Sequence, residues 1–123
     1  MKAWIGAVAL VGTLASGNAI ADGNELLRQC QATVREMSDG STGTWSYDAG
    51  YCIGRVASLL DMLNGYGKLL PANLKVCMPK EKVSYGQGVR IVIKFLEAHP
   101  DVLHNGETAL MQIAFRLAFP CKD

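Results

Sequence analysis

Residues 84–100 read SYGQGVRIVIKFLEAHP, and this stretch decides the fold class. It opens with a capping box, in which the Ser84 side chain accepts a hydrogen bond from the Gln87 amide and the glutamine reaches back. Apolar residues then recur at the spacing of one helix face. They are Val89, Val92, Ile93 and Leu96. Because Pro100 prevents continuation, we predict a helix that ends near His99.

Two further helices are expected on the N-terminal side of this stretch. Asp22 and Glu25 form a second capping box, which opens a helix over about residues 24–37. A polar, Gly-rich loop follows it. The next helix begins after Trp45 and carries apolar residues at helical spacing as far as Leu63, where an Asn-Gly-Tyr-Gly sequence stops it.

A fourth helix starts near Asn105 or Gly106 and is cut by Pro120. It carries two apolar stripes, Leu110, Ile113, Ala114 and Leu117 on one and Met111, Phe115 and Phe119 on the other. Two stripes indicate either burial on both sides or contact with a second copy of the chain. No stretch alternates convincingly with period two between hairpin turns. The expected fold class is therefore all-α, a compact bundle of about four helices with two disulfides.

The second expected helix has a ridge with almost no side chains, because Gly50, Gly54 and Ser58 recur every fourth residue. A glycine inside a helix costs about 1 kcal/mol relative to alanine. We therefore expect that another helix packs closely against this ridge. A ligand groove along the ridge is the alternative.

The first 21 residues are expected to be a secretory signal peptide. Lys2 precedes a thirteen-residue apolar run, and Ala19-Ile20-Ala21 is a processing site. The run is too short to span a bilayer, and no cysteine follows the site to carry a lipid. Cleavage after Ala21 would leave residues 22–123 as one domain, free in the periplasm and not bound to a membrane.

All four cysteines lie in this exported part of the chain: Cys30, Cys52, Cys77 and Cys121. An even set in an oxidising compartment predicts two disulfides, and the wide spacing argues against zinc. We favour pairing of Cys52 with Cys77 and of Cys30 with Cys121. Leu63 lies roughly 17 Å along the helix from Cys52, and the chain that follows is long enough to return over that distance.

Charge and motifs exclude several functions. Without Lys2 the chain has 11 basic and 11 acidic residues, which predicts no footprint for nucleic acid or anionic lipid. No motif for a nucleophile, a phosphate or a metal is present, so no cofactor and no enzyme activity are expected. A Cys52 nucleophile paired with a histidine is the alternative, but it conflicts with the disulfides. His99 is placed to cap carbonyls at a helix end.

Short motifs in a specific order cover nearly the whole exported part. They are Leu26-Leu27, Cys30, Cys52-Ile53-Gly54, Asp61, Cys77-Met78-Pro79, Gly86-Gln87, the Phe-Leu-Glu-Ala-His-Pro of residues 95–100, Leu103-His104 and Ala118-Phe119-Pro120-Cys121. Together they resemble the Rap1a/Tai immunity proteins, which are exported partners of type VI secretion amidase effectors. The chain departs from that pattern at Arg55, where the family often has tyrosine, and at Ser58, where a second glycine is usual.

The resemblance implies a small helical homodimer in the periplasm that binds and blocks a peptidoglycan amidase and has no activity of its own. Such an inhibitor needs a rigid scaffold and a protruding polar loop. Residues 101–107 join two predicted helices and hold four candidates for contact with a Cys/His active site: Asp101, His104, Asn105 and Glu107. Capping is an equal alternative, with Asn105 and Glu107 at a helix start and His104 packed beneath the turn.

Two other functions remain open at this level. A periplasmic acid-stress chaperone would expose apolar surface as its carboxylates are neutralised, which dye binding between pH 7 and pH 2 would detect. The chain has eleven acidic residues but only two histidines, so few of its groups could drive such a switch near pH 6. An inhibitor of another wall hydrolase, such as a lysozyme, would be identified by its partner in a pull-down.

Overall fold

The computed structural model describes residues 21–40 and 43–122, so the predicted signal peptide lies outside the described residues except for Ala21. The described part contains four α-helices and no strand, which confirms the all-α prediction. The helices are α2 (Gly23–Ser38), α3 (Tyr47–Tyr66), α4 (Tyr85–Ala98) and α5 (Glu107–Ala118), with short 3₁₀ helices η1 (Gly67–Leu69) and η2 (Pro100–Val102). Each helix lies within a few residues of its predicted position.

The predicted N-terminal caps are present. An Asp22 carboxylate oxygen accepts from the Glu25 amide at 3.1 Å, and the Ser84 hydroxyl accepts from the Gln87 amide at the same distance. A third cap was not predicted. The Ser46 hydroxyl accepts from the Ala49 amide at 3.2 Å and begins α3. Each cap satisfies an amide that has no partner within its helix.

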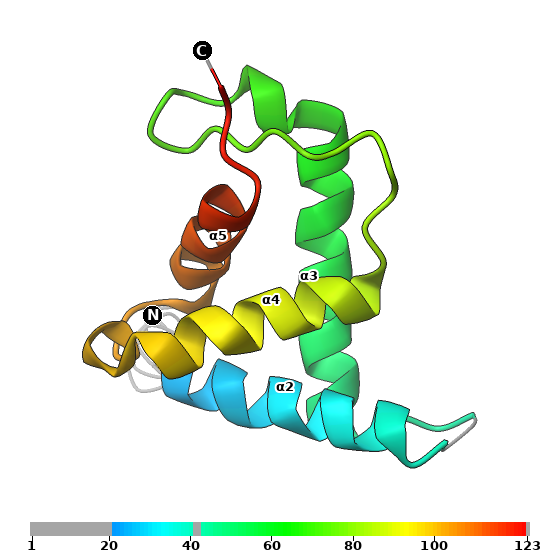
Figure 1. Ribbon diagram of the computed structural model, residues 1–123. Coiled ribbons are helices and arrows are strands. Elements are labelled where there is room, and N and C mark those ends of the chain that lie inside the picture. Colours follow the sequence, from blue (N-terminus) through cyan, green and yellow to red (C-terminus); the bar gives the residue numbers. More distant parts are fainter. Residues whose placement is uncertain (1–20, 41–42, 123) are drawn as a thin grey trace, which may run out of the picture.

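The four helices enclose one core. In Figure 1, α2 and α4 lie one above the other, α3 crosses both, and α5 lies above α4 in the view. Helix α2 packs against α3 and α4, and α4 packs against α3 and α5. The largest fully buried side chains come from all four helices and include Leu26, Leu60, Leu96, Leu110 and Phe115. Burial of such side chains is the main source of stability.

The close helix crossing lies at Gly88, not at the predicted ridge. A Cβ at Gly88 would lie 2.5 Å from Leu60 Cδ1 and 2.9 Å from Val56 Cγ1, so a side chain there would force Leu60 and Val56 to move where α4 meets α3. Gly54 has no heavy atom within 4 Å of its Cβ position. The prediction that another helix packs on the Gly50-Gly54-Ser58 ridge was therefore wrong. Spacing identifies a bare ridge, but it does not say which side of the helix faces the core.

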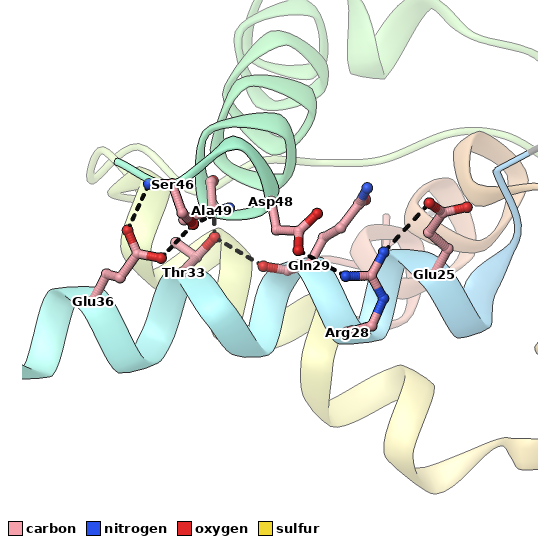
Figure 2. A network of polar contacts seen from close by, with 8 residues as sticks. All are labelled: Glu25, Arg28, Gln29, Thr33, Glu36, Ser46, Asp48 and Ala49. Carbon is pink, nitrogen blue, oxygen red and sulfur yellow. Dashed lines mark hydrogen bonds and ion pairs between the residues drawn. The ribbon is translucent and has the colours of Figure 1, made fainter. Parts of the chain in front are cut away.

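Polar contacts fix the start of α3 against the middle of α2 (Figure 2). The fully buried Thr33 hydroxyl donates to the Ala49 carbonyl at 2.9 Å, and Arg28 forms an ion pair with Asp48 at 2.7 Å. Glu36 accepts hydrogen bonds from the hydroxyl and the amide of Ser46, and these bonds lower the pKa of the Glu36 carboxyl below its ordinary value. The orientation of α3 on α2 is thus set by hydrogen bonds as well as by packing.

Both expected disulfides are present, but the favoured pairing was wrong. Cys30 is bonded to Cys52, and Cys77 is bonded to Cys121. The prediction assumed that the chain after α3 returns along the helix to Cys52. Instead, the Val76 amide donates to the Gly67 carbonyl at 3.1 Å and closes a loop at the far end of α3. Cys77 therefore stays near the C-terminal segment, while Cys52 faces α2.

Candidate functional site

The connection between α4 and α5 is a tightly bonded turn and forms the candidate site. It begins with η2, and the Val102 amide donates to the His99 carbonyl at 3.2 Å. The Asn105 amide then donates to the Val102 carbonyl at 3.0 Å, while Val102 and Leu103 pack against the core. We call residues 99–106 the connecting loop. Its backbone is held in one conformation although its outer side chains face solvent.

The N-terminal segment of the described chain pairs with the connecting loop. The Gly23 amide donates to the Asn105 carbonyl at 3.1 Å, and the Glu107 amide donates to the Ala21 carbonyl at 3.3 Å. A side chain at Gly23 would come within 2.9 Å of the Leu103 carbonyl oxygen. Only glycine therefore allows this approach, and Figure 1 shows the start of α2 beside the loop. The loop is supported from a part of the sequence about eighty residues away.

His99 has the structural role that the sequence predicted. Its Nδ1 lies 2.7 Å from the Phe95 carbonyl oxygen at the end of α4. Its ring also stacks on the Phe95 ring, with 4.3 Å between the centroids. The imidazole is thus held against the helix it ends, and His104 is the histidine of the loop that faces solvent.

Three of the four predicted contact residues are exposed: Asp101, His104 and Asn105. Asn105 has a structural role as well, because its side-chain amide donates to the Val102 carbonyl at 2.9 Å. The alternative that His104 packs beneath the turn was wrong, since the side chain is exposed. Asp101 and His104 therefore offer a carboxylate and an imidazole on a fixed backbone.

Glu107 differs from the other three, because its side chain faces the interior and is only 5% exposed. The Tyr51 hydroxyl donates to Glu107 Oε1 at 2.9 Å, which raises the Tyr51 pKa because the bond to a carboxylate favours the protonated phenol. Arg55 Nε lies 2.9 Å from the same oxygen, an ion-pair distance without the alignment of a hydrogen bond. The Glu107 carboxylate is thus engaged within the protein.

Arg55 extends this group of contacts to the next residue of α5, because its guanidinium donates to the Thr108 hydroxyl. We call Tyr51, Arg55, Glu107 and Thr108 the Glu107 cluster. It joins α3 to the first turn of α5, where the connecting loop ends. No local pattern predicted the cluster, since its residues on α3 lie more than fifty positions from their partners on α5. Arg55, which departs from the family pattern, was the single indication.

The connecting loop offers polar groups that can contact another protein. All four cysteines are in disulfides. Across residues 21–40 and 43–122, no group of three or more metal-ligating side chains comes together. The same ranges contain no helix that is long and apolar enough to cross a bilayer. What the loop presents is a fixed backbone with exposed polar side chains, which is suited to recognition of another protein.

Comparison with protein families identifies the kind of protein. A family model described as Rap1a immunity proteins matches residues 22–121. The match covers all four helices, both disulfides, the connecting loop and the Glu107 cluster. Searches of curated proteins and of solved structures find no match.

Proposed function

Because this chain belongs to the Rap1a immunity protein family, we propose that it acts in the periplasm by binding and blocking a peptidoglycan amidase delivered by type VI secretion. An immunity protein protects by binding its effector, so a partner protein follows from the family. The amidase is inferred from the resemblance. A periplasmic location is supported by the signal-peptide pattern and by two disulfides, which persist in an oxidising compartment.

The observation that carries the proposal is the fixed connecting loop with exposed Asp101 and His104 at its surface. A segment that enters an enzyme cleft loses less conformational entropy if it is already ordered. The pairing with residues 21–23 and the Glu107 cluster provide that order from two sides. In this proposal Asp101, His104 and Asn105 contact the amidase, and Glu107 positions the loop from behind.

Replacing Asp101 and His104 together by alanine is expected to weaken inhibition of the cognate amidase by about 30-fold or more. The melting midpoint should stay within about 1 °C of the wild type, because neither side chain forms a hydrogen bond within the described residues. Amidase assays with titrated inhibitor measure the first quantity, and thermal unfolding measures the second.

A matched control replaces Glu81 and Lys82 by alanine, two exposed charged residues before α4. This variant should inhibit as the wild type does. Full inhibition by the loop variant would show that the binding face lies elsewhere. The same titration with a lysozyme tests the alternative that the target is another wall hydrolase. If the protein inhibits the lysozyme but not the amidase, the lysozyme is the target.

We also propose that the protein is a homodimer. The outer face of α5 is the surface through which the two copies would contact each other. The structure buries Met111 and Phe115 in the core but leaves Ile113 exposed and Leu117 63% exposed. These two side chains lie four residues apart, on one side of the helix. Apolar residues in such an arrangement are typical of a contact with a second copy.

Replacing Ile113 and Leu117 by glutamate should weaken self-association by about 100-fold or more, because the contact would then bury unpaired charges. Sedimentation velocity over a concentration series measures this shift. Leu69→Glu, at another exposed leucine, is the control and should leave the dimer intact. A wild-type protein that stays monomeric, or a dimer that survives both glutamates, would contradict the assignment.

A further inference from the structure

One end of the molecule concentrates positive charge although the exported chain is neutral in total. Residues 66–80 and 116–122 contain no aspartate or glutamate, whereas Asp123, which follows, lies outside the described residues. The two stretches hold five exposed cations: Lys68, Lys75, Lys80, Arg116 and Lys122. We call these stretches together the basic end. Net charge alone predicts no footprint for anionic lipid, but it does not describe how charge is distributed over the surface.

The fold brings the two stretches of the basic end together. The Cys77–Cys121 disulfide joins them, and the Cys77 amide donates to the Phe119 carbonyl at 3.0 Å. Figure 1 shows η1, the loop after it and the C-terminal segment at the same end of the molecule, at the top of the view. Within the described chain, the ion pairs involve Arg28 and Arg55, and none of the five cations takes part in one.

Two hollows at this end each have a pair of cations in their walls. Lys75 and Arg116 line a hollow of about 710 Å³ between the loop after η1 and the C-terminal segment. Lys68 and Lys80 line a second of about 370 Å³, together with Leu69. No carboxylate lines either hollow. Lys80 also lines a neighbouring hollow that contains Asp61. The cations that are available to phosphate groups of a ligand and have no carboxylate in their hollows are therefore Lys68, Lys75 and Arg116.

Large apolar side chains are exposed among these cations. Leu69, next to Lys68, is 77% exposed, and Tyr66 and Leu74 also face solvent. The exposed lysines alone would bind any polyanion. Exposed leucine and tyrosine beside lysine gain further free energy at a bilayer surface, where apolar material lies behind the anionic layer.

We propose that the basic end binds the surface of an anionic lipid bilayer. Lys68, Lys75 and Arg116 contact headgroup phosphates, and Leu69 and Leu74 enter the interface between headgroups and acyl chains. Helix α5 begins at the connecting loop and ends at the basic end, so the two surfaces are about 18 Å apart along its axis. Attachment through the basic end therefore leaves the connecting loop free for a protein partner.

The test is co-sedimentation of the mature protein with phosphatidylcholine vesicles, with and without phosphatidylglycerol. Binding is expected only to the anionic vesicles and should weaken as salt is raised. Replacing Lys68 and Lys75 by glutamine should weaken binding about 30-fold, since each cation near the surface contributes comparably. Replacing Leu69 and Leu74 by serine should weaken it about tenfold without any change of charge.

The matched control replaces Arg90 and Lys94 by glutamine, which makes the same charge change on α4. It should bind vesicles as the wild type does. Three outcomes would overturn the proposal. They are a failure of the protein to bind anionic vesicles, a loss of vesicle binding in the control as large as that in the Lys68 and Lys75 variant, and sedimentation of the protein with isolated peptidoglycan and not with vesicles. All these variants should still inhibit the amidase, so failure here is distinct from failure of the proposed function.

Discussion

Replacing Cys30 and Cys52 by alanine is expected to lower the free energy of unfolding by about 5 kcal/mol. The bridge closes a segment with a sequence separation of 22 residues, which corresponds to about 3 kcal/mol of chain entropy in the unfolded state. Both sulfurs are fully buried, and their loss leaves a cavity between α2 and α3 that adds about 2 kcal/mol. The free energy of unfolding of a small domain is about 5–15 kcal/mol, so this variant would lose a large part of it.

Urea unfolding of the oxidised proteins measures this difference. The comparison variant removes Cys77 and Cys121, which close a longer segment but are only half-buried. It should cost about 4 kcal/mol, nearly all of it from chain entropy. Peptide mapping of the wild type gives the independent check, because a Cys52–Cys77 peptide would contradict the pairing on which both figures rest.

Replacing Glu107 by alanine is expected to lower the free energy of unfolding by about 3 kcal/mol and to weaken inhibition as well. Removal of one member of a buried ion pair leaves the other without its partner. Here the Arg55 side chain is 39% exposed and can be rehydrated, which keeps the cost at the lower end of the usual range. The loss of inhibition follows because Glu107 begins α5 directly after the connecting loop.

Two milder variants separate the ion pair from the hydrogen bond in the Glu107 cluster. Glu107→Gln keeps an acceptor for the Tyr51 hydroxyl and should cost about 1 kcal/mol. Tyr51→Phe instead removes that hydrogen bond and keeps the ion pair with Arg55, and the two effects should not simply add, because both contacts share one carboxylate oxygen. Unfolding and amidase inhibition are measured for each variant at a temperature where all are folded. A Glu107→Ala protein as stable as the wild type would show that the cluster does not stabilise the fold.

The helices were predictable because their signals are local. Asp22 and Ser84 cap their helices through residues only three positions away, and apolar periodicity spans single turns. The disulfide pairing was not predictable from the same signals. It depends on where α3 crosses α2 and on the loop closed between Gly67 and Val76, both of which are contacts between separate segments.

The candidate site was predictable in part for the same reason. The connecting loop follows from Pro100 and from the helices on either side, so its polar residues were correctly placed together. The inward direction of Glu107 depends on Tyr51 and Arg55, which approach it only in the folded protein. Likewise, a count of charges did not reveal the basic end, because its two stretches meet only in the folded protein, through the Cys77–Cys121 bridge and the hydrogen bond beside it.

The pairing of residues 21–24 with the connecting loop sets an order of folding events for a chain that emerges N-terminus first. The Asn24 side chain donates to the Leu103 carbonyl across 79 positions, and the Gly23 amide bonds to the Asn105 carbonyl. If the chain emerges N-terminus first, its leading segment waits for the last two helices before it finds these partners. The loop thus gains its support from residues 21–24 only when nearly the whole chain is available to fold. In the proposed function, a partly exported chain would lack the ordered loop that is expected to contact the amidase.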